Sequence, residues 1–262
     1  VPLLLIGPDG AGRSTLLRHA YDALVDDTRL VYQVGPDPSG LASPYYPIRS
    51  LLAAILNLPA AATVGDLRKA TLAIGLSEQD VPGIAQLFGH PTTLLELEPA
   101  VRRREMVEAA QRALEHAAAL NPAAIVCEDV DRFDEPSLEI LRRASEVTDR
   151  ELPPIVMTAP PVFGVQWPAW VPRIELGALD ASDLDAIVHA IAPRVRGLPP
   201  AQQLFETTRA LPGHVDHLVR YLLEGGKPED TKVSLPDLVA ARVSMLSRET
   251  REVLQAAAVL GI

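Results

Sequence analysis

The sequence contains little of several residue types, and each shortage excludes a class of protein. Only one of its 262 residues is cysteine, which excludes a disulfide framework, and the apolar surroundings of Cys127 indicate a reducing compartment. No run of about 18 uninterrupted apolar residues occurs, which excludes a membrane-spanning helix. We therefore expect a cytoplasmic protein without a membrane partner.

Positive charge and aromatic residues are also scarce. The chain has 24 Lys and Arg against 34 Asp and Glu, and its only lysines are Lys69, Lys227 and Lys232. The resulting net charge of −10 argues against broad nucleic-acid binding by this segment. Aromatic residues make up 4% and hydrophobic residues 48%, so the expected core consists mainly of Ala, Leu, Val and Ile.

The most informative stretch lies near the start of the chain, where glycines follow an apolar run. Leu3–Ile6 indicates a buried strand, residues 7–12 read Gly-Pro-Asp-Gly-Ala-Gly, and a helix is expected over residues 14–25. Glycines let successive backbone N–H groups turn toward one point, and a helix N-terminus adds partial positive charge. The pattern is typical of a phosphate-binding loop. The alternative is an ordinary glycine turn between a strand and a helix.

One position departs from the phosphate-loop pattern G-x-x-x-x-G-K-[ST]. Arg13 stands where lysine is expected, and Ser14 stands where a hydroxyl would ligate Mg²⁺. Arginine keeps the charge, but its planar fork is wider than the ammonium group of lysine. The sequence therefore leaves open whether this loop binds a nucleotide and hydrolyses it, or only binds it.

Two acidic residues, Glu128 and Asp129, directly follow a second strongly apolar run at residues 123–127. An NTPase needs a carboxylate after a neighbouring strand to hold Mg²⁺ through its water shell, and a second acid usually polarises the attacking water. The first acid is Glu rather than Asp. The alternative is that the two acids merely end a strand. Asp131 and Asp134 are predicted to be loop and helix-capping acids.

Strands and helices alternate through the first two thirds of the chain, which predicts an α/β fold with a parallel sheet and helices on both faces. Further strands are expected at 28–34, 154–158 and 173–176, and further helices at 48–58, 64–74, 78–88, 100–120 and 136–147. Ligand is expected at the carboxyl ends of the strands. The arginine run 102–104 is interpreted as a solvated face, and the alternative is an arginine that reaches a neighbour's phosphate.

After Gly177 the pattern predicts helices only, at 180–192, 199–209, 213–223, 235–246 and 248–260, with a linker at 225–230. We therefore expect an α/β core at 1–178 with a helical insertion at about 48–90, a helical lid at 179–226, and a further helical region at 227–262. The chain starts within a strand and stops in an apolar helix, so we expect a segment of a longer protein.

The residues around the acid pair resemble a known family. Residues 126–141, VCEDVDRFDEPSLEIL, look like the Walker B region of AAA-type NTPase domains of the STAND class, which occur in large LuxR-type regulators and fused to adenylate cyclases and bacterial Ser/Thr kinases. Residues 45–47, 235–242 and 246–261 resemble the same family. The resemblance implies a P-loop NTPase with five parallel strands, a helical lid, and the truncated start of a winged-helix region. It also implies ATP or ADP with Mg²⁺ as cofactors.

The resemblance also assigns roles to individual residues by position. The nucleotide-binding residues it implies are Gly7, Gly10, Ala11, Gly12, Arg13, Ser14, Thr15, Thr158 and Pro212. Ser14 and Glu128 would hold Mg²⁺, and Glu128 and Asp129 would be the catalytic pair. The family often has an arginine just beyond Thr158, where this chain has Pro160 and Pro161, and its lid motif Gly-x-Pro aligns with Ala210-Leu211-Pro212. His214 is interpreted as a surface histidine, with a nucleotide contact as the alternative.

These observations predict an ATP- or ADP-binding regulatory module of a multidomain bacterial signalling protein that acts as a slow or impaired ATPase switch. Its expected partners are flanking effector domains of the same chain and other proteins, and oligomerisation is left open. The alternative is a non-hydrolysing scaffold for protein interaction. A DNA-handling motor is disfavoured by the acidic charge.

Overall fold

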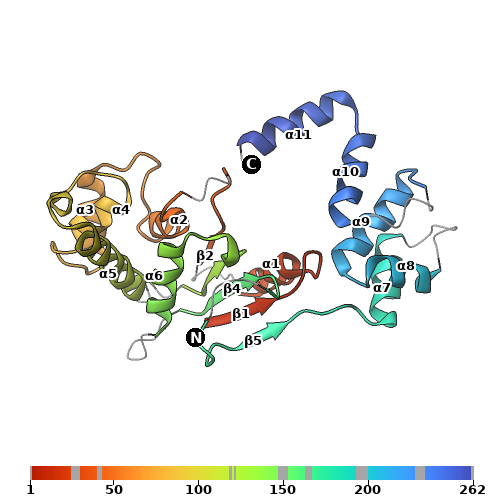
Figure 1. Ribbon diagram of the computed structural model, residues 1–262, viewed down its shortest axis with the longest axis horizontal. Helices are drawn as coiled ribbons and strands as arrows, with labels where there is room; N and C mark the ends of the chain where they lie inside the picture. The colour runs from red at the N-terminus through yellow and green to blue at the C-terminus, as the bar shows by residue number, and fades with distance from the viewer. Residues whose placement is uncertain are drawn as a thin grey trace. The chain divides into compact units, whose positions relative to one another are not determined.

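The computed structural model describes residues 2–24, 30–39, 43–117, 120, 122–146, 153–162, 167–192, 200–227 and 234–260. The chain forms two compact units, which are described separately (Figure 1). Unit 1 consists of residues 1–5 and 17–174, and unit 2 consists of residues 6–16 and 175–262. Parts of the predicted elements, at residues 25, 28–29, 118–119, 147, 199, 228–230 and 261, lie outside the described residues.

The sheet has five parallel strands, as predicted, and their order in the sheet is β2-β3-β4-β1-β5. The strands are β1 (Pro2–Ile6), β2 (Val31–Val34), β3 (Ala124–Cys127), β4 (Ile155–Ala159) and β5 (Arg173–Glu175). β3 pairs in parallel with β2 on one side and with β4 on the other. Every residue of β3 is buried. This is expected, because an interior strand of a parallel sheet is covered on both faces and has a continuous apolar sequence.

Each helix that the sequence predicts in the first two thirds of the chain is present within a few residues of its predicted bounds. These helices are α1 (Arg13–Leu24), α2 (Tyr46–Ile55), α3 (Val64–Ala73), α4 (Val81–Leu87), α5 (Pro99–Ala117) and α6 (Glu135–Glu146). The sequence did not predict the short 3₁₀ helices η1 (Thr93–Glu96) and η3 (Val130–Arg132). α2 begins earlier than predicted because Pro47 fits the first turn of a helix, where its missing N–H is not needed.

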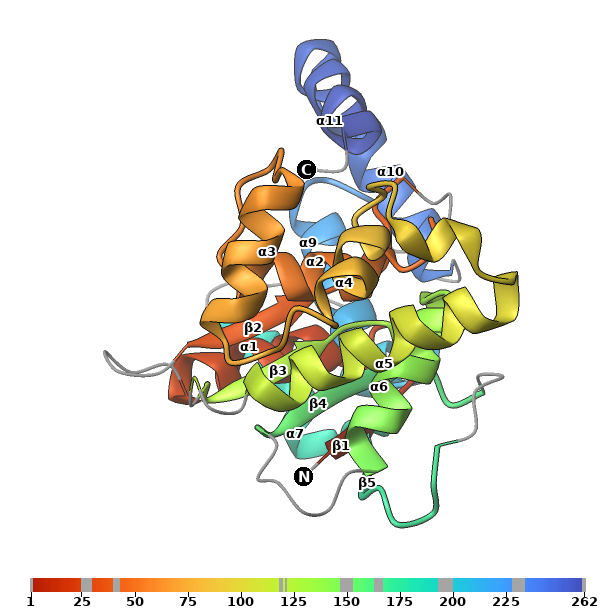
Figure 2. The ribbon, with the colours of Figure 1, turned by 90° about the vertical axis from the view of Figure 1, so that its left-hand side faces the viewer.

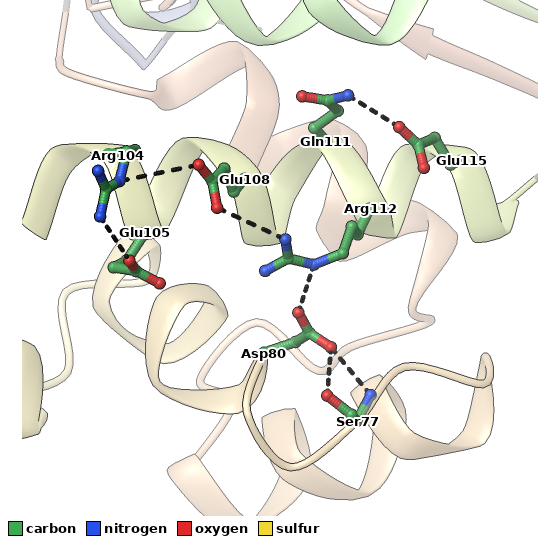
Figure 3. A network of polar contacts seen from close by, with 8 residues as sticks. All are labelled: Ser77, Asp80, Arg104, Glu105, Glu108, Gln111, Arg112 and Glu115. Atoms are coloured by element: carbon green, nitrogen blue, oxygen red, sulfur yellow. Dashed lines mark hydrogen bonds and ion pairs between the residues drawn. The ribbon is translucent and has the colours of Figure 1, made fainter. Parts of the chain in front are cut away.

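A polar network joins α5 to the start of α4 (Figure 3). The buried carboxylate of Asp80 accepts hydrogen bonds from the backbone and hydroxyl of Ser77 and from Arg112 Nε, the last at 2.6 Å. Burial alone raises the pKa of Asp80, but these hydrogen bonds outweigh it and leave the pKa lowered. α4 is thus joined to α5 through a buried, hydrogen-bonded carboxylate as well as through packing, and α3 packs on α4.

The arginine run on α5 lies at the surface, in agreement with the interpretation as a solvated face. Arg103 pairs with Glu139 of α6 at 2.8 Å, and Arg104 lies near Glu105 and Glu108 of its own helix. Both arginine side chains are at least half exposed, so these pairs contribute little to stability. α5 and α6 pack side by side in unit 1 (Figure 2).

The second unit is helical after β5. Its helices are α7 (Ala181–Ile191), α8 (Ala201–Thr208), α9 (Pro212–Leu223), α10 (Leu235–Met245) and α11 (Arg248–Leu260). α7 to α10 share one apolar core, which includes Leu184, Leu204, Leu218 and Leu238. A winged helix beginning at residue 227 stays a prediction. Within the described ranges, no helix combines the length and the apolar character that crossing a membrane requires.

Candidate functional site

The residues that we call the glycine loop, Gly7 to Gly12, connect β1 to α1 and belong to unit 2. Gly10 and Gly12 have φ angles of 83° and 91°, a region that glycine adopts without steric cost. The Ala11 N–H donates to the Pro8 carbonyl at 3.0 Å and closes a turn within the loop. The loop therefore has the compact strand-to-helix turn that the sequence predicts.

Arg13, the first residue of α1, folds back onto this loop. One end of its guanidinium donates to the Gly7 carbonyl at 2.8 Å, and the other donates to Asp9 Oδ1 at 3.1 Å. The Arg13 side chain is 12% exposed, whereas the Asp9 side chain is 88% exposed. The charge that replaces the expected lysine is thus located against the loop itself rather than in open solvent.

The N-terminal turn of α9 packs directly on the glycine loop. The Gly213 N–H donates to the Gly10 carbonyl at 2.8 Å, and a Cβ added to Gly213 would lie 3.0 Å from Gly10 Cα. A Cβ added to Gly12 would lie 4.0 Å from the Pro212 ring, so the predicted residue Pro212 does lie beside the loop. Gly213 was not among the predicted site residues, although a glycine directly after the lid proline was a usable signal.

The segment before α9 explains the glycine of the lid motif. Arg209 and Ala210 both have left-handed backbone conformations, with φ angles of 53° and 52°. Side chains disfavour this region, and glycine does not. Ala210 occupies the glycine position of the motif and is fully buried, and its carbonyl accepts a hydrogen bond from the Leu179 N–H at 2.8 Å. Ala210 therefore has a left-handed conformation of the kind that glycine adopts most easily, although it is not glycine.

A cavity of about 770 Å³ lies beside the glycine loop within unit 2. Pro8 and Asp9 line it on the loop side, and the helical segments contribute Gln203, Glu206, Thr207, Arg209, Leu211, His214, Ser234 and Leu235. Its walls combine charged, amide, hydroxyl and apolar groups, so the cavity can accept a ligand that has polar and apolar parts. His214, which was interpreted as a surface histidine, is half-buried and lines this cavity.

The acid turn, which we define as Glu128 and Asp129, belongs to unit 1 and leads from β3 into η3. Asp129 has a left-handed backbone with φ 48° and ψ 53°. Its N–H donates to Thr158 Oγ1 at 2.9 Å, and Thr158, on β4, is 1% exposed. Thr158, which the resemblance places at a sensor position, therefore contacts the backbone of the second acid.

Glu128 has a partner that the sequence did not indicate. Gln33 of β2 donates a hydrogen bond from Nε2 to Glu128 Oε1, although 95 residues separate the two. The Glu128 N–H also donates to the Val34 carbonyl at 2.8 Å. Glutamate is longer than the aspartate expected at this position, and the Glu128 carboxylate points to the neighbouring strand β2, where the Gln33 amide binds it.

Two neighbouring residues have structural roles. Asp134 accepts hydrogen bonds from the backbone and hydroxyl of Ser137 and caps α6, as predicted. Burial raises the pKa of Cys127 to about 12, so its sulfur stays a neutral thiol and is a poor nucleophile. The described part of the chain contains no group of three or more His, Cys, Asp or Glu side chains that could hold a metal ion by themselves.

The two motifs follow two different strands of the sheet. The glycine loop begins where β1 ends, the acid turn begins where β3 ends, and β4 lies between these strands. The model of the AAA ATPase domain family matches residues 2–157, which is more than half of the chain. The chain belongs to the AAA ATPase domain family. The glycine loop and the acid turn both lie within the matched part of this AAA ATPase domain.

The chain is also similar to a curated relative and to solved structures. It is 26% identical over 286 residues to the uncharacterized protein R02095 of Rhizobium meliloti, a match that covers 99% of the chain and 27% of the relative. Its fold is similar to that of a Signal Transduction ATPase with Numerous Domains (STAND) protein with a tetratricopeptide repeat sensor from Pyrococcus horikoshii. That match has a TM-score of 0.53 and 14% identity, and it covers 97% of this chain and 31% of the archaeal one.

A Walker-type ATPase of Pyrococcus abyssi matches with a TM-score of 0.46 and 14% identity, over 98% of this chain and 71% of that one. The AAA domain described here spans less than a third of the length of both the rhizobial relative and the STAND protein. The α/β fold with five parallel strands that the resemblance implied is confirmed, and it is similar to the fold of the archaeal STAND protein.

Proposed function

We propose that this AAA domain binds ATP or ADP with Mg²⁺ and acts as a slow ATPase switch in a multidomain signalling protein. The observation that carries the proposal is the glycine loop, with left-handed Gly10 and Gly12 between β1 and the twelve-residue helix α1. Alternating backbone conformations of this kind turn N–H groups toward one point, where an anion binds. The Arg13 guanidinium lies against the same loop and adds the positive charge that phosphate requires.

The chemistry of the donor set fits a nucleotide. Backbone N–H groups of Gly10 to Ser14 and the guanidinium of Arg13 would bind the phosphates. The cavity beside Pro8 and Asp9 offers amide, hydroxyl and apolar groups for the rest of a ligand. Bound Mg²⁺ would supply charge neutralisation on the phosphates, and the Ser14 hydroxyl and the Glu128 carboxylate would hold it, the latter through water.

The acid turn would supply the hydrolytic function. Asp129 would orient and polarise the attacking water as a general base. Thr158 would act as a positioning residue, because its hydroxyl accepts the Asp129 N–H and so fixes the backbone that carries this carboxylate. The strand order supports this assignment, since one strand separates β1 from β3 at the edge where parallel sheets bind ligands.

A non-hydrolysing scaffold is the second candidate. The observation that favours it is that both residues that depart from the pattern are bound by side chains of this chain, Arg13 by Asp9 and Glu128 by Gln33. These contacts compete with the phosphate and metal contacts that turnover requires. Flanking effector domains and protein partners are proposed for either candidate.

Titration calorimetry with ADP and ATP in the presence of Mg²⁺, combined with single-turnover hydrolysis, tests the proposal. Arg13→Ala should weaken binding by roughly 10- to 100-fold, since a hydrogen bond to a charged group contributes about 1.5–3 kcal/mol. Asp129→Ala should leave ADP binding within about threefold but lower turnover by roughly 100-fold or more. If the unmodified domain hydrolyses ATP no faster than Asp129→Ala does, the ATPase switch is excluded and the non-hydrolysing scaffold is the remaining candidate. Absence of ADP and ATP binding would overturn nucleotide binding itself.

A further inference from the structure

Asp9 lies in the middle of the glycine loop, and its carboxylate is the acid that Arg13 contacts there. The guanidinium spans the loop, with 2.8 Å to the Gly7 carbonyl at one end and 3.1 Å to Asp9 Oδ1 at the other. Asp9 is not needed to fill space, because 88% of its side chain is exposed. Its contribution to the loop is therefore mainly its negative charge.

A carboxylate and a phosphate bind to the same N–H donors of a guanidinium. Both offer two anionic oxygens to a planar fork of N–H donors, so they compete for the same face of an arginine. Arg13 is 12% exposed, so its donors are limited to groups that lie close to the loop. A phosphate that approaches the guanidinium from the side of Asp9 meets a carboxylate already in that position.

Asp9 also contributes a wall of the 770 Å³ cavity, in which Glu206 is a second acid. A negatively charged ligand that extends from the loop into this cavity passes the exposed carboxylate of Asp9. Two negative charges repel each other, so the Asp9 carboxylate disfavours binding of an anionic ligand, and salt screens this repulsion. Competition for the guanidinium and repulsion of the ligand act in the same direction.

We propose that Asp9 is an affinity-determining residue that competes with phosphate for the Arg13 guanidinium. This inference rests on the proposed function of the glycine loop. It assigns to Asp9 a role opposite to that of the other loop residues, since it weakens phosphate binding rather than supporting it. The loop then holds phosphate less tightly than its glycines and its arginine alone would allow.

A double-mutant cycle on the whole chain tests the proposal, with inorganic pyrophosphate and ADP as probes in titration calorimetry at low ionic strength. Asp9→Asn keeps the size of the side chain and removes its charge. It should tighten binding of both probes roughly two- to fivefold, the range of a partly exposed ion pair. In the Arg13→Ala background the same change should give a smaller gain, because the competed donor is gone and only the repulsion between Asp9 and the ligand remains.

Asp22→Asn is the matched control, because it removes one negative charge from an exposed residue of α1 outside the loop. It should change affinity by less than about 1.5-fold, so that a larger response to Asp9→Asn reports position rather than net charge. Equal or weaker binding by Asp9→Asn would overturn the competition while leaving nucleotide binding in place. An unchanged gain in the Arg13→Ala background would also overturn it. If neither the unmodified chain nor Asp9→Asn binds either probe, the proposed function and this inference both fail.

Discussion

The glycine loop and the acid turn each contain one residue that departs from the type expected in an NTPase, and the structure accommodates the two departures differently. Each has a longer side chain than expected, Arg13 for lysine and Glu128 for aspartate, and each of these side chains contacts a partner of opposite or complementary character. The partner of Arg13 is Asp9, four residues away. The partner of Glu128 is Gln33, on another strand and 95 residues away.

This difference distinguishes a local solution from one that depends on the sheet. The Arg13–Asp9 pair depends only on the local turn from the loop into α1. The Gln33–Glu128 contact requires in addition that β2 and β3 pair in one particular register. The glycine loop and the acid turn also differ in how they are held in place. The glycine loop is packed through positions that lack side chains, and the acid turn is fixed by the hydroxyl of Thr158.

Thr158→Val should have the largest effect on the acid turn. Valine keeps the shape of threonine but cannot accept the Asp129 N–H, and an unsatisfied buried donor costs about 1–3 kcal/mol. We expect the free energy of unfolding in urea to fall by that amount, with ADP affinity less affected than turnover. Thr158→Ser is the control, because it keeps the hydroxyl and loses only a methyl group, about 0.8 kcal/mol. The role of the hydrogen bond would be refuted if valine proved no worse than serine.

Gly213→Ala tests whether the glycine loop depends on the absence of a side chain. The added Cβ would lie 3.0 Å from Gly10 Cα and 3.2 Å from the Gly10 carbonyl oxygen, so the backbone contact has to open. Overpacking costs about 1–3 kcal/mol, and alanine returns up to about 1 kcal/mol of helix propensity. We expect a net loss of about 1 kcal/mol in urea unfolding, accompanied by weaker ADP binding.

The matched control for Gly213 is Gly65, because both are the second residue of a helix. A Cβ on Gly65 would meet only the Thr63 hydroxyl, at an ordinary 3.6 Å. Gly65→Ala should therefore stabilise the chain by up to about 1 kcal/mol. A shared sign for the two substitutions would mean that the contact between Gly213 and Gly10 does not constrain the loop.

The sequence predicted the parts of the site that depend on local pattern. The alternation of apolar strands and helices gave the parallel sheet, and the glycine spacing gave the turn into α1. Asp134 was recognised as a cap because it precedes α6 directly.

The remaining features depend on contacts between distant segments. The Gln33–Glu128 hydrogen bond follows from the pairing of Gln33 with Val126, and a register is not visible in either strand alone. The packing of Gly213 on Gly10 joins residues 203 positions apart, so no periodicity reports it. The 3₁₀ helices η1 and η3 are too short to produce a periodic signal.

Gln33→Glu should have the smallest effect, and it tests whether the acid turn depends on its distant partner. Glutamate keeps the size of the side chain but places a second carboxylate opposite Glu128, whereas Gln33→Ala only removes the amide. Because Gln33 is exposed, we expect Gln33→Glu to lower the free energy of unfolding at neutral pH by about 0.5 kcal/mol more than Gln33→Ala. The difference should disappear in about 1 M salt, where the Debye length is only about 3 Å. Urea unfolding at low and high salt measures it, and equal stability of the two variants at low salt would show that Gln33 and Glu128 do not interact.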